Sequence, residues 1–148
     1  IQMADLLREV GRRFDFCLLD APAGLGRGFQ LATCAADRCV VVTTADASSL
    51  RDAQHTVMEL DRFPSGALHL VVNRVRKKLL RQLHATIDDA IDKAGLPLLG
   101  VVPEDDALPL CMNRGVPILL ADGQSAATAY RNIAKRLQGE RVPLLRIR

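Results

Sequence analysis

The sequence is poor in aromatic side chains, with no tryptophan, one tyrosine and four phenylalanines among 148 residues. Such a chain has no aromatic platform for stacking single-stranded nucleic acid, so we expect no nucleic-acid partner. It also lacks any apolar run near the roughly 18 residues that a membrane-spanning helix needs. None of its four cysteines forms a Cys-x-x-Cys pair. This absence argues against zinc or structural disulfides and favours a reducing cytosol, with Cys17 and Cys34 as small core residues.

The composition that remains is that of a packed globular domain. Hydrophobic residues make up 49% and charged residues 25% of the chain, close to the globular average. A chain of this length suits one domain and could bury about 70% of its unfolded surface. We find no internal repeat, low-complexity segment or linker. We therefore expect one domain over residues 1–138, followed by a carboxyl-terminal tail over residues 139–148.

A short apolar run, residues 16–19, ends abruptly at the carboxylate of Asp20. Its length and its flanking turn residues predict a strand buried on both faces, as in a parallel sheet. Pro22 cannot continue a ladder, and three glycines in residues 24–28 let a backbone approach a ligand closely. A carboxylate after such a strand lies where open α/β sheets bind ligands, and P-loop NTPases hold Mg²⁺ in this way. A plain turn or helix cap is the alternative, but the glycine-rich segment favours a ligand site.

The rest of the chain alternates short apolar runs with helical patterns. We expect strands at residues 16–19, 38–44, 68–73 and 98–102, and an extended stretch at 117–120. We expect helices at 3–13 and 28–36, a short helix after residue 106 and a final helix at 125–137. Two further helices are expected: one is opened by Asp46 and capped by Ser48 or Ser49, and the other is an amphipathic helix that carries Leu80, Leu83, Ile87 and Ile91. This alternation predicts a doubly wound, mostly parallel α/β sheet with helices on both faces.

Several of these segments resemble the MinD family of septum-site-determining ATPases, within the ParA/MinD group. The first is the stretch from Asp20 to Phe29, which is similar to the family's Walker B and switch II segment. The likeness continues, in order, through Val40–Thr44, Val71–Val75, Leu99–Asp105, Asn113–Pro117 and Ala129–Ile133. It covers nearly the whole chain and implies a P-loop NTPase fold.

The family's phosphate loop, Lys-Gly-Gly-x-Gly-Lys-Thr, does not occur in these 148 residues. Because Ile1 is also not an initiator methionine, we expect the chain to be the carboxyl-terminal part of a longer protein with an incomplete fold. In the family, the phosphate-loop strand lies between the strands that correspond to residues 16–20 and 39–44. Those two strands must either pair directly or leave a gap with unpaired backbone groups.

The resemblance assigns roles at the Walker B end of the site. It implies that Asp20 holds Mg²⁺ through a water molecule and that Gly24 offers its backbone N–H to the γ-phosphate of ATP. The helix opened by Asp46 corresponds to a dimer and partner surface, although Ala45-Asp46 stands where the family usually has Pro-Glu.

The resemblance also assigns the base-binding end. It implies that Asn73 hydrogen-bonds the adenine edge, with Arg74 beside it, and that the backbone of Pro103, Glu104 and Asp105 lines the base pocket. Parallel strands would bring these residues to one edge of the sheet. The alternative for Asn73 is a turn residue that caps the next helix, and the acidic side chains of the loop are expected to be solvated. The cluster Arg74, Arg76, Lys77, Lys78 and Arg81 is expected to be a solvated face, or else a patch for an acidic partner or anionic lipid.

The resemblance implies that the intact protein binds MgATP, forms a homodimer with ATP and regulates placement of the division septum. It implies a cytoplasmic protein that is peripheral at the inner face of the cell membrane, with cell-division regulator proteins as partners. We expect this chain alone to be inactive and its tail, broken by Gly139 and Pro143, to bind membrane weakly. The alternatives are a ParA-like partitioning ATPase and a non-catalytic α/β interaction domain.

Overall fold

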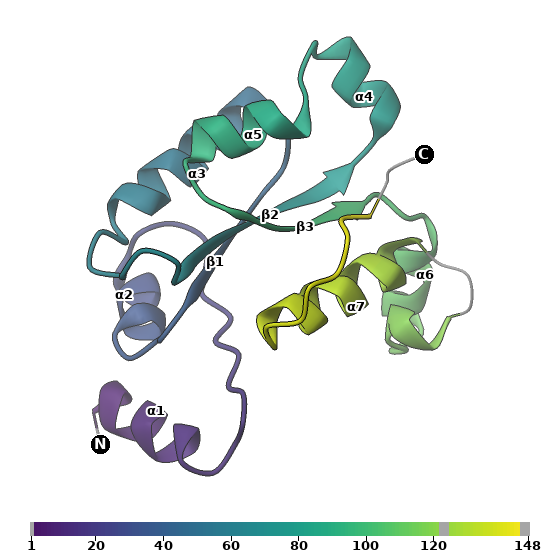
Figure 1. Cartoon of the computed structure of the whole chain (residues 1–148). Helices are drawn as coiled ribbons and strands as arrows, with labels where there is room; N and C mark the ends of the chain where they lie inside the picture. The colour runs from purple at the N-terminus through teal and green to yellow at the C-terminus, as the bar shows by residue number, and fades with distance from the viewer. Residues whose placement is uncertain (1, 122–124, 146–148) are drawn as a thin grey trace.

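The computed structural model describes residues 2–121 and 125–145. Its elements, in chain order, are α1 (Met3–Gly11), α2 (Arg27–Thr33), β1 (Cys39–Thr43), α3 (Ala47–Met58), β2 (Leu68–Val75), α4 (Lys77–Gln82), α5 (Ile87–Ala94), β3 (Leu98–Pro103), α6 (Ala107–Asn113), the 3-10 helix η1 (Ile118–Leu120) and α7 (Ser125–Leu137). The strands form one parallel sheet in the order β1-β2-β3. Helices cover both faces of this sheet (Figure 1), so the expected fold class is confirmed.

Two hydrophobic cores hold the helices against the sheet. On one face, Leu50 of α3 and Ala90 of α5 pack with Leu70 of β2. On the other face, Ala126 of α7 packs with Leu99 of β3. Figure 1 shows α3 and α5 above the sheet and α6 and α7 below it. Because apolar side chains from both faces of β2 and β3 are buried, these two strands are near-continuous hydrophobic runs, as expected for a parallel sheet.

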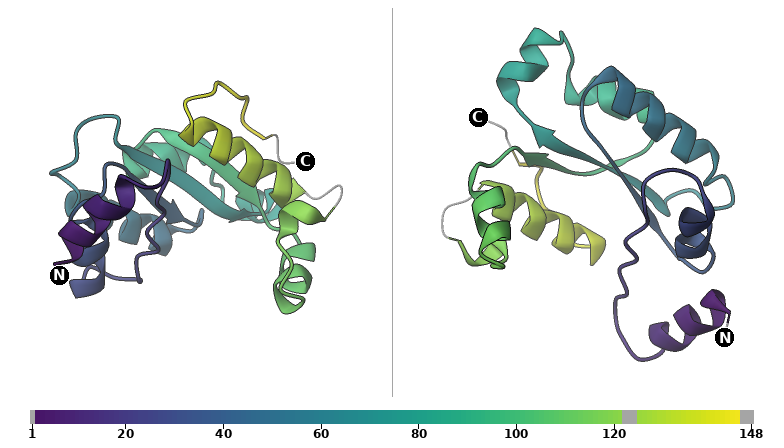
Figure 2. Two further views of the ribbon diagram at one scale, coloured as in Figure 1. Left: turned by 90° about the horizontal axis from the view of Figure 1, so that it is seen from below. Right: turned by 180° about the vertical axis from the view of Figure 1, so that it is seen from behind.

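The strand expected at residues 16–19 is wrong. This segment is coil, and Phe16 and Leu18 are 59% and 85% exposed. The physical reason is that a strand needs a neighbour, whereas β1 pairs only with β2 among the described residues. Cys17 is accordingly exposed and not a core residue. Figures 1 and 2 show the segment between α1 and α2 as coil on the β1 side of the sheet, so the gap between it and β1 remains.

Strand β1 is buried on only one face. Val41 and Thr43 are buried, but Val40 and Val42 are 38% and 60% exposed. The difference arises because α3 packs on one face of β1, whereas on the other face α7 packs on β3. Of the described strands, β1 is therefore the one with an exposed apolar face.

The amphipathic helix expected to run from Leu80 to Ile91 is two helices, α4 and α5. The hydroxyl oxygen of Thr86 accepts the backbone N–H of Asp89 at 3.1 Å, and the Asp89 carboxylate accepts the N–H of Thr86 at 2.7 Å. This capping box starts a new helix in the middle of the apolar pattern. His84, just before it, has a left-handed backbone with φ 48°.

Two smaller differences concern the remainder of the chain. Cys34, expected in the core, is exposed at the end of α2. The stretch expected to be extended at residues 117–120 contains η1, whereas α7 matches the expected final helix. Within the described ranges no helix has the length and apolar character needed to cross a membrane.

The tail lies against α7. The Arg136 guanidinium donates to the carbonyl oxygens of Leu99, at 3.1 Å, and of Val142. Leu145 packs on the core beneath α7. Ile147, in the tail that was expected to bind membrane weakly, lies outside the described residues.

Candidate functional site at the carboxyl edge of the sheet

A bulge shapes the carboxyl end of β2. Val72 pairs with Val101 and Val75 pairs with Pro103, so β2 has one more residue than β3 across this step. The bulged residues are Asn73 and Arg74, and Arg74 has φ 53°. A left-handed backbone is costly for a side chain of this size, and bulges next to binding sites re-aim side chains. This part of the sheet edge is therefore built irregularly around the two residues expected to bind a cofactor.

The side chain of Asn73 has no hydrogen-bond partner in the part of the chain that the structure describes. Asn73 lies within β2 and is half-buried. The suggestion that it caps the following helix is wrong, because Arg76 is the residue before α4 and no side chain caps that helix. Its amide keeps one acceptor and two donor hydrogens for another molecule.

Glu104 joins the ends of β2 and β3. Its carboxylate accepts from Nη2 of Arg74 at 3.1 Å and also pairs with Nε of Arg76, and its backbone N–H donates to the carbonyl of Val75 at 3.1 Å. The hydrogen bond from Arg74 holds the pKa of Glu104 below its usual value, and Arg76 adds to this effect. The expectation of a solvated side chain is wrong, because the carboxylate is fixed by two guanidinium groups.

Asp105 fixes the same loop to two helices. One carboxylate oxygen accepts the backbone N–H of Ala107, at 3.0 Å, in the first turn of α6. The other accepts the backbone N–H of Ala126, at 3.2 Å, and the hydroxyl of Ser125, at 3.5 Å, in the first turn of α7. For Asp105, too, the solvated loop acid is a wrong expectation, because the side chain satisfies backbone donors that each helix start leaves unpaired.

Replacing Asp105 with alanine is therefore expected to lower the free energy of unfolding by about 1–2 kcal/mol, the cost of losing a helix cap. Urea unfolding followed by circular dichroism measures this change. Asp106→Ala is the matched control, because its exposed side chain caps no helix, and it should change stability by less than about 0.5 kcal/mol. Equal effects of the two substitutions would show that the bonds of Asp105 contribute nothing.

Asp20 and Gly24 belong to a different segment of the chain. Both are exposed in the coil between α1 and α2, and Asp20 does not end a strand. Across the described residues, no hydrogen bond or ion pair links them to the loop after β3. Gly24 has φ +87° with nothing within 4 Å of the position a Cβ would take, so it has the freedom to present its N–H.

The chemistry of the donors fits the base end of a nucleotide better than its phosphate end. The free amide of Asn73 and the fixed backbone from Pro103 to Asp105 are suited to a planar base. No group of three His, Cys, Asp or Glu side chains able to hold a metal occurs in the described residues. Asp20 therefore offers Mg²⁺ a single exposed carboxylate.

A third polar cluster follows β1. The Thr44 hydroxyl is hydrogen-bonded to the Asp46 carboxylate and, at 2.7 Å, to the Ser49 hydroxyl, and Asp46 accepts the backbone N–H of Ser49 at 3.0 Å. The hydrogen bonds that Asp46 accepts lower its pKa to about 2, with the bond from the Thr44 hydroxyl contributing most and those from Ser49 adding to it. Asp46 is thus the cap of α3, and the expectation that Ser48 or Ser49 caps it is wrong.

Arg76 was not expected at this site. The signal in the sequence was a basic residue just after β2 and an acidic one just after β3. Adjacent parallel strands bring such neighbours together, because their carboxyl ends meet at one edge of the sheet.

The comparisons with known proteins agree with this architecture. A family model described as cellulose biosynthesis protein BcsQ matches residues 2–137. The septum site-determining protein MinD of Bacillus subtilis is 37% identical over 145 residues, covering 97% of this chain and 54% of that protein. MinD of a Synechocystis strain is 33% identical over 147 residues, covering 97% of this chain and 55% of its own length. The chain thus spans about half the length of the curated relatives it matches.

Solved structures give the same result. The MinD cell division protein of Aquifex aeolicus superposes with a TM-score of 0.90 at 31% identity, covering 97% of this chain and 62% of that one. A MinC:MinD complex from the same organism gives 0.90 at 30% identity, covering 98% and 61%. MinD of Pyrococcus horikoshii complexed with Mg-ADP gives 0.79 at 25% identity, covering 92% and 55%. The chain therefore belongs to the MinD-like ParA family and has its P-loop NTPase fold.

Proposed function

We propose that this chain supplies the base-binding part of a MinD-like ATPase that regulates placement of the division septum. The observation that carries the proposal is the edge where β2 and β3 end. There, Asn73, whose amide has no hydrogen-bond partner among the described residues, lies in the strand beside the end of β3, and the acids that follow β3, Glu104 and Asp105, are both fixed by other elements. A rigid edge with one free donor and acceptor set is suited to reading a base.

Under this proposal, Asn73 hydrogen-bonds the adenine edge and the backbone from Pro103 to Asp105 lines the base pocket, with Arg74 holding Glu104. Asp20 orients a water molecule on Mg²⁺, and Gly24 presents its N–H toward the γ-phosphate. When bound, MgATP supplies the phosphoryl group that is transferred to water, and the protein contributes position and charge. The Mg-ADP in the Pyrococcus protein supports the cofactor.

The test is calorimetric titration with MgATP. This chain should show no measurable binding, because the phosphate-loop motif does not occur in its sequence. The gene product with any upstream coding sequence included should bind MgATP. In that protein, Asn73→Ala should weaken binding about tenfold, as expected when a buried base loses its hydrogen bonds, and Asp20→Ala should abolish hydrolysis.

The control is Asn132→Ala, which changes an amide on α7 away from the sheet edge. Micromolar MgATP binding by this chain alone would contradict the division of roles. Hydrolysis that survives Asp20→Ala would contradict the assignment of the Walker B residue.

Dimerisation with ATP, reversible membrane association and stimulation by a division regulator complete the proposed function. The MinC:MinD complex of Aquifex supports a regulator as partner. A ParA-like partitioning ATPase remains the alternative within the family. It predicts salt-sensitive DNA binding by the intact protein, which a filter-binding assay measures.

A role in cellulose biosynthesis is the second candidate function, because the family model that spans residues 2–137 carries that description. Loss of the gene distinguishes the two. Misplaced septa in time-lapse microscopy would support the division role. Normal septa with loss of cellulose, measured by dye binding, would support the second candidate.

A further inference from the structure

The segment around α4 is a basic surface of which the proposed function uses only Arg74. It consists of Arg74, Arg76, Lys77, Lys78 and Arg81, all of them exposed; we call it the α4 basic patch. Figure 1 shows α4 projecting from the body of the molecule beyond the end of β2. The patch is therefore accessible over a wide angle.

The charges of the α4 basic patch are largely uncompensated. One carboxylate, Glu104, serves both Arg74 and Arg76. Lys77, Lys78 and Arg81 have no ion-pair partner within residues 2–121 and 125–145. The next carboxylates along the chain lie on α5, and one of them, Asp89, is occupied by the Thr86 cap.

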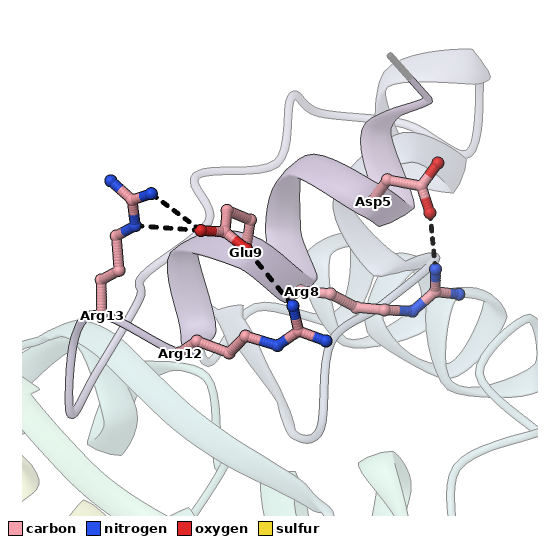
Figure 3. Close-up of polar contacts among 5 residues, drawn as sticks. All are labelled: Asp5, Arg8, Glu9, Arg12 and Arg13. Atoms are coloured by element: carbon pink, nitrogen blue, oxygen red, sulfur yellow. Dashed lines mark hydrogen bonds and ion pairs between the residues drawn. The ribbon is translucent and has the colours of Figure 1, made fainter.

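Helix α1 shows the opposite arrangement. Arg8 of α1 and the two arginines that follow the helix each pair with a carboxylate of α1 (Figure 3): Arg8 with Asp5 at 2.7 Å, Arg12 with Glu9 at 3.4 Å and Arg13 with Glu9 at 2.8 Å. The cations of α4 do not stabilise their own helix in this way. Lys77 and Lys78 even occupy its first turn, where the helix dipole disfavours positive charge.

Two leucines of the same segment are also exposed. Leu79 lies in α4 and Leu83 directly follows it, and each is 45% exposed. Because they are four residues apart, they lie on the same side of the helix. Leu80 packs against the core beneath α3 and α5. Helix α4 is thus anchored through one leucine while two others face outward.

The backbone on either side holds α4 in this position. Arg74 and His84 have φ 53° and 48°, and they are the only non-glycine residues with positive φ among those described. They bracket α4. Such conformations persist only where the surrounding structure imposes them, and they cluster at functional segments.

We infer that the α4 basic patch, with Leu79 and Leu83, is a contact surface for an anionic lipid bilayer. Lysine and arginine attract a negatively charged surface without requiring fixed geometry, and the exposed leucines gain by entering the apolar boundary beneath the headgroups. A purely acidic protein surface would leave the leucines unburied, which is why lipid is the favoured partner. This inference rests on the membrane association in the proposed function, and it identifies a surface other than the tail that would contact the membrane.

Vesicle sedimentation of the 148-residue chain, without nucleotide, tests this inference. The chain should bind vesicles of phosphatidylcholine and phosphatidylglycerol in equal parts, but not pure phosphatidylcholine. The variant K77Q/K78Q should bind at least about tenfold more weakly, since each basic residue near an anionic surface contributes about fivefold. L79S/L83S should also weaken binding, although it leaves every charge in place.

The matched control is R8Q/R12Q, which removes one cation from α1 and one from the residue that follows it, and which should leave binding unchanged. Circular dichroism confirms that each variant is folded. Equal weakening by the control would overturn the inference, because it would show an effect of net charge alone. Binding of an acidic peptide or duplex DNA through Lys77 and Lys78, with no binding to vesicles, would also overturn it. Because no nucleotide is present, failure of the ATPase proposal leaves this result interpretable.

Discussion

Replacing Gly100 with alanine is expected to lower the free energy of unfolding by about 1–3 kcal/mol, the cost of overpacking a filled core. A Cβ at this position of β3 would lie 2.4 Å from Cγ1 and 2.8 Å from Cδ1 of Ile133 on α7. Ile133 cannot move away freely, because it packs on the core between β3 and α7. Helix α7 must therefore shift, or Ile133 must adopt a poorer rotamer.

A double-mutant cycle identifies the cause. Ile133→Ala removes the obstructing atoms, so Gly100→Ala should cost at least about 1 kcal/mol less in that background than in the wild type. Gly11→Ala, at the exposed end of α1 where nothing lies within 4 Å, is the control and should not destabilise the chain. Urea unfolding of the five proteins gives all the values. Additive effects of Gly100→Ala and Ile133→Ala would refute the close approach.

The elements that could be predicted from the sequence are those whose pattern is decided locally. Helix α7 has an uninterrupted amphipathic period, and Gly139 after it adopts φ +89°, which ends a helix readily. The three strands that form are compact apolar runs between turn residues. In these segments propensity, pattern and tertiary packing all favour the same structure.

The two clearest failures come from information that is not local. Residues 16–19 have the pattern of a buried strand, but a strand exists only where another strand satisfies its backbone, and none of those described lies alongside. Leu80 and Ile91 share one apolar period, yet the hydrogen bonds of Thr86 interrupt the helix between them. Periodicity shows which residues face inward and does not show whether the backbone is continuous.

The candidate site also has one part that could be predicted from the sequence and one part that could not. That the ends of β2 and β3 would lie at one edge, where Arg74 pairs with Glu104, followed from parallel topology alone. What could not be predicted is that Asp105 caps two helices, one of which starts twenty residues further along the chain. Contacts of such long sequence separation depend on the packed arrangement of β3, α6 and α7, which no local pattern encodes.

The exposed edge of β1 leads to the prediction with the widest consequences: the purified chain should associate as its concentration rises. Strand β1 pairs only with β2 among the described residues, so its other edge has free backbone donors and acceptors. Beside that edge lie the exposed side chains of Val40 and Val42, and Phe16 and Leu18 add further apolar surface from the coil. Native sheets avoid such edges because they pair readily with another strand.

Val42→Lys places a charge on this edge strand and should shift the chain toward monomer, because lysine on an edge opposes strand pairing. Sedimentation velocity across a wide concentration range measures the change. Met58→Lys is the matched control: it adds the same charge at a 74% exposed apolar residue on α3 and should leave the association unchanged. A wild-type chain that remains monomeric at every concentration and unfolds cooperatively would show that the β1 edge is protected in solution.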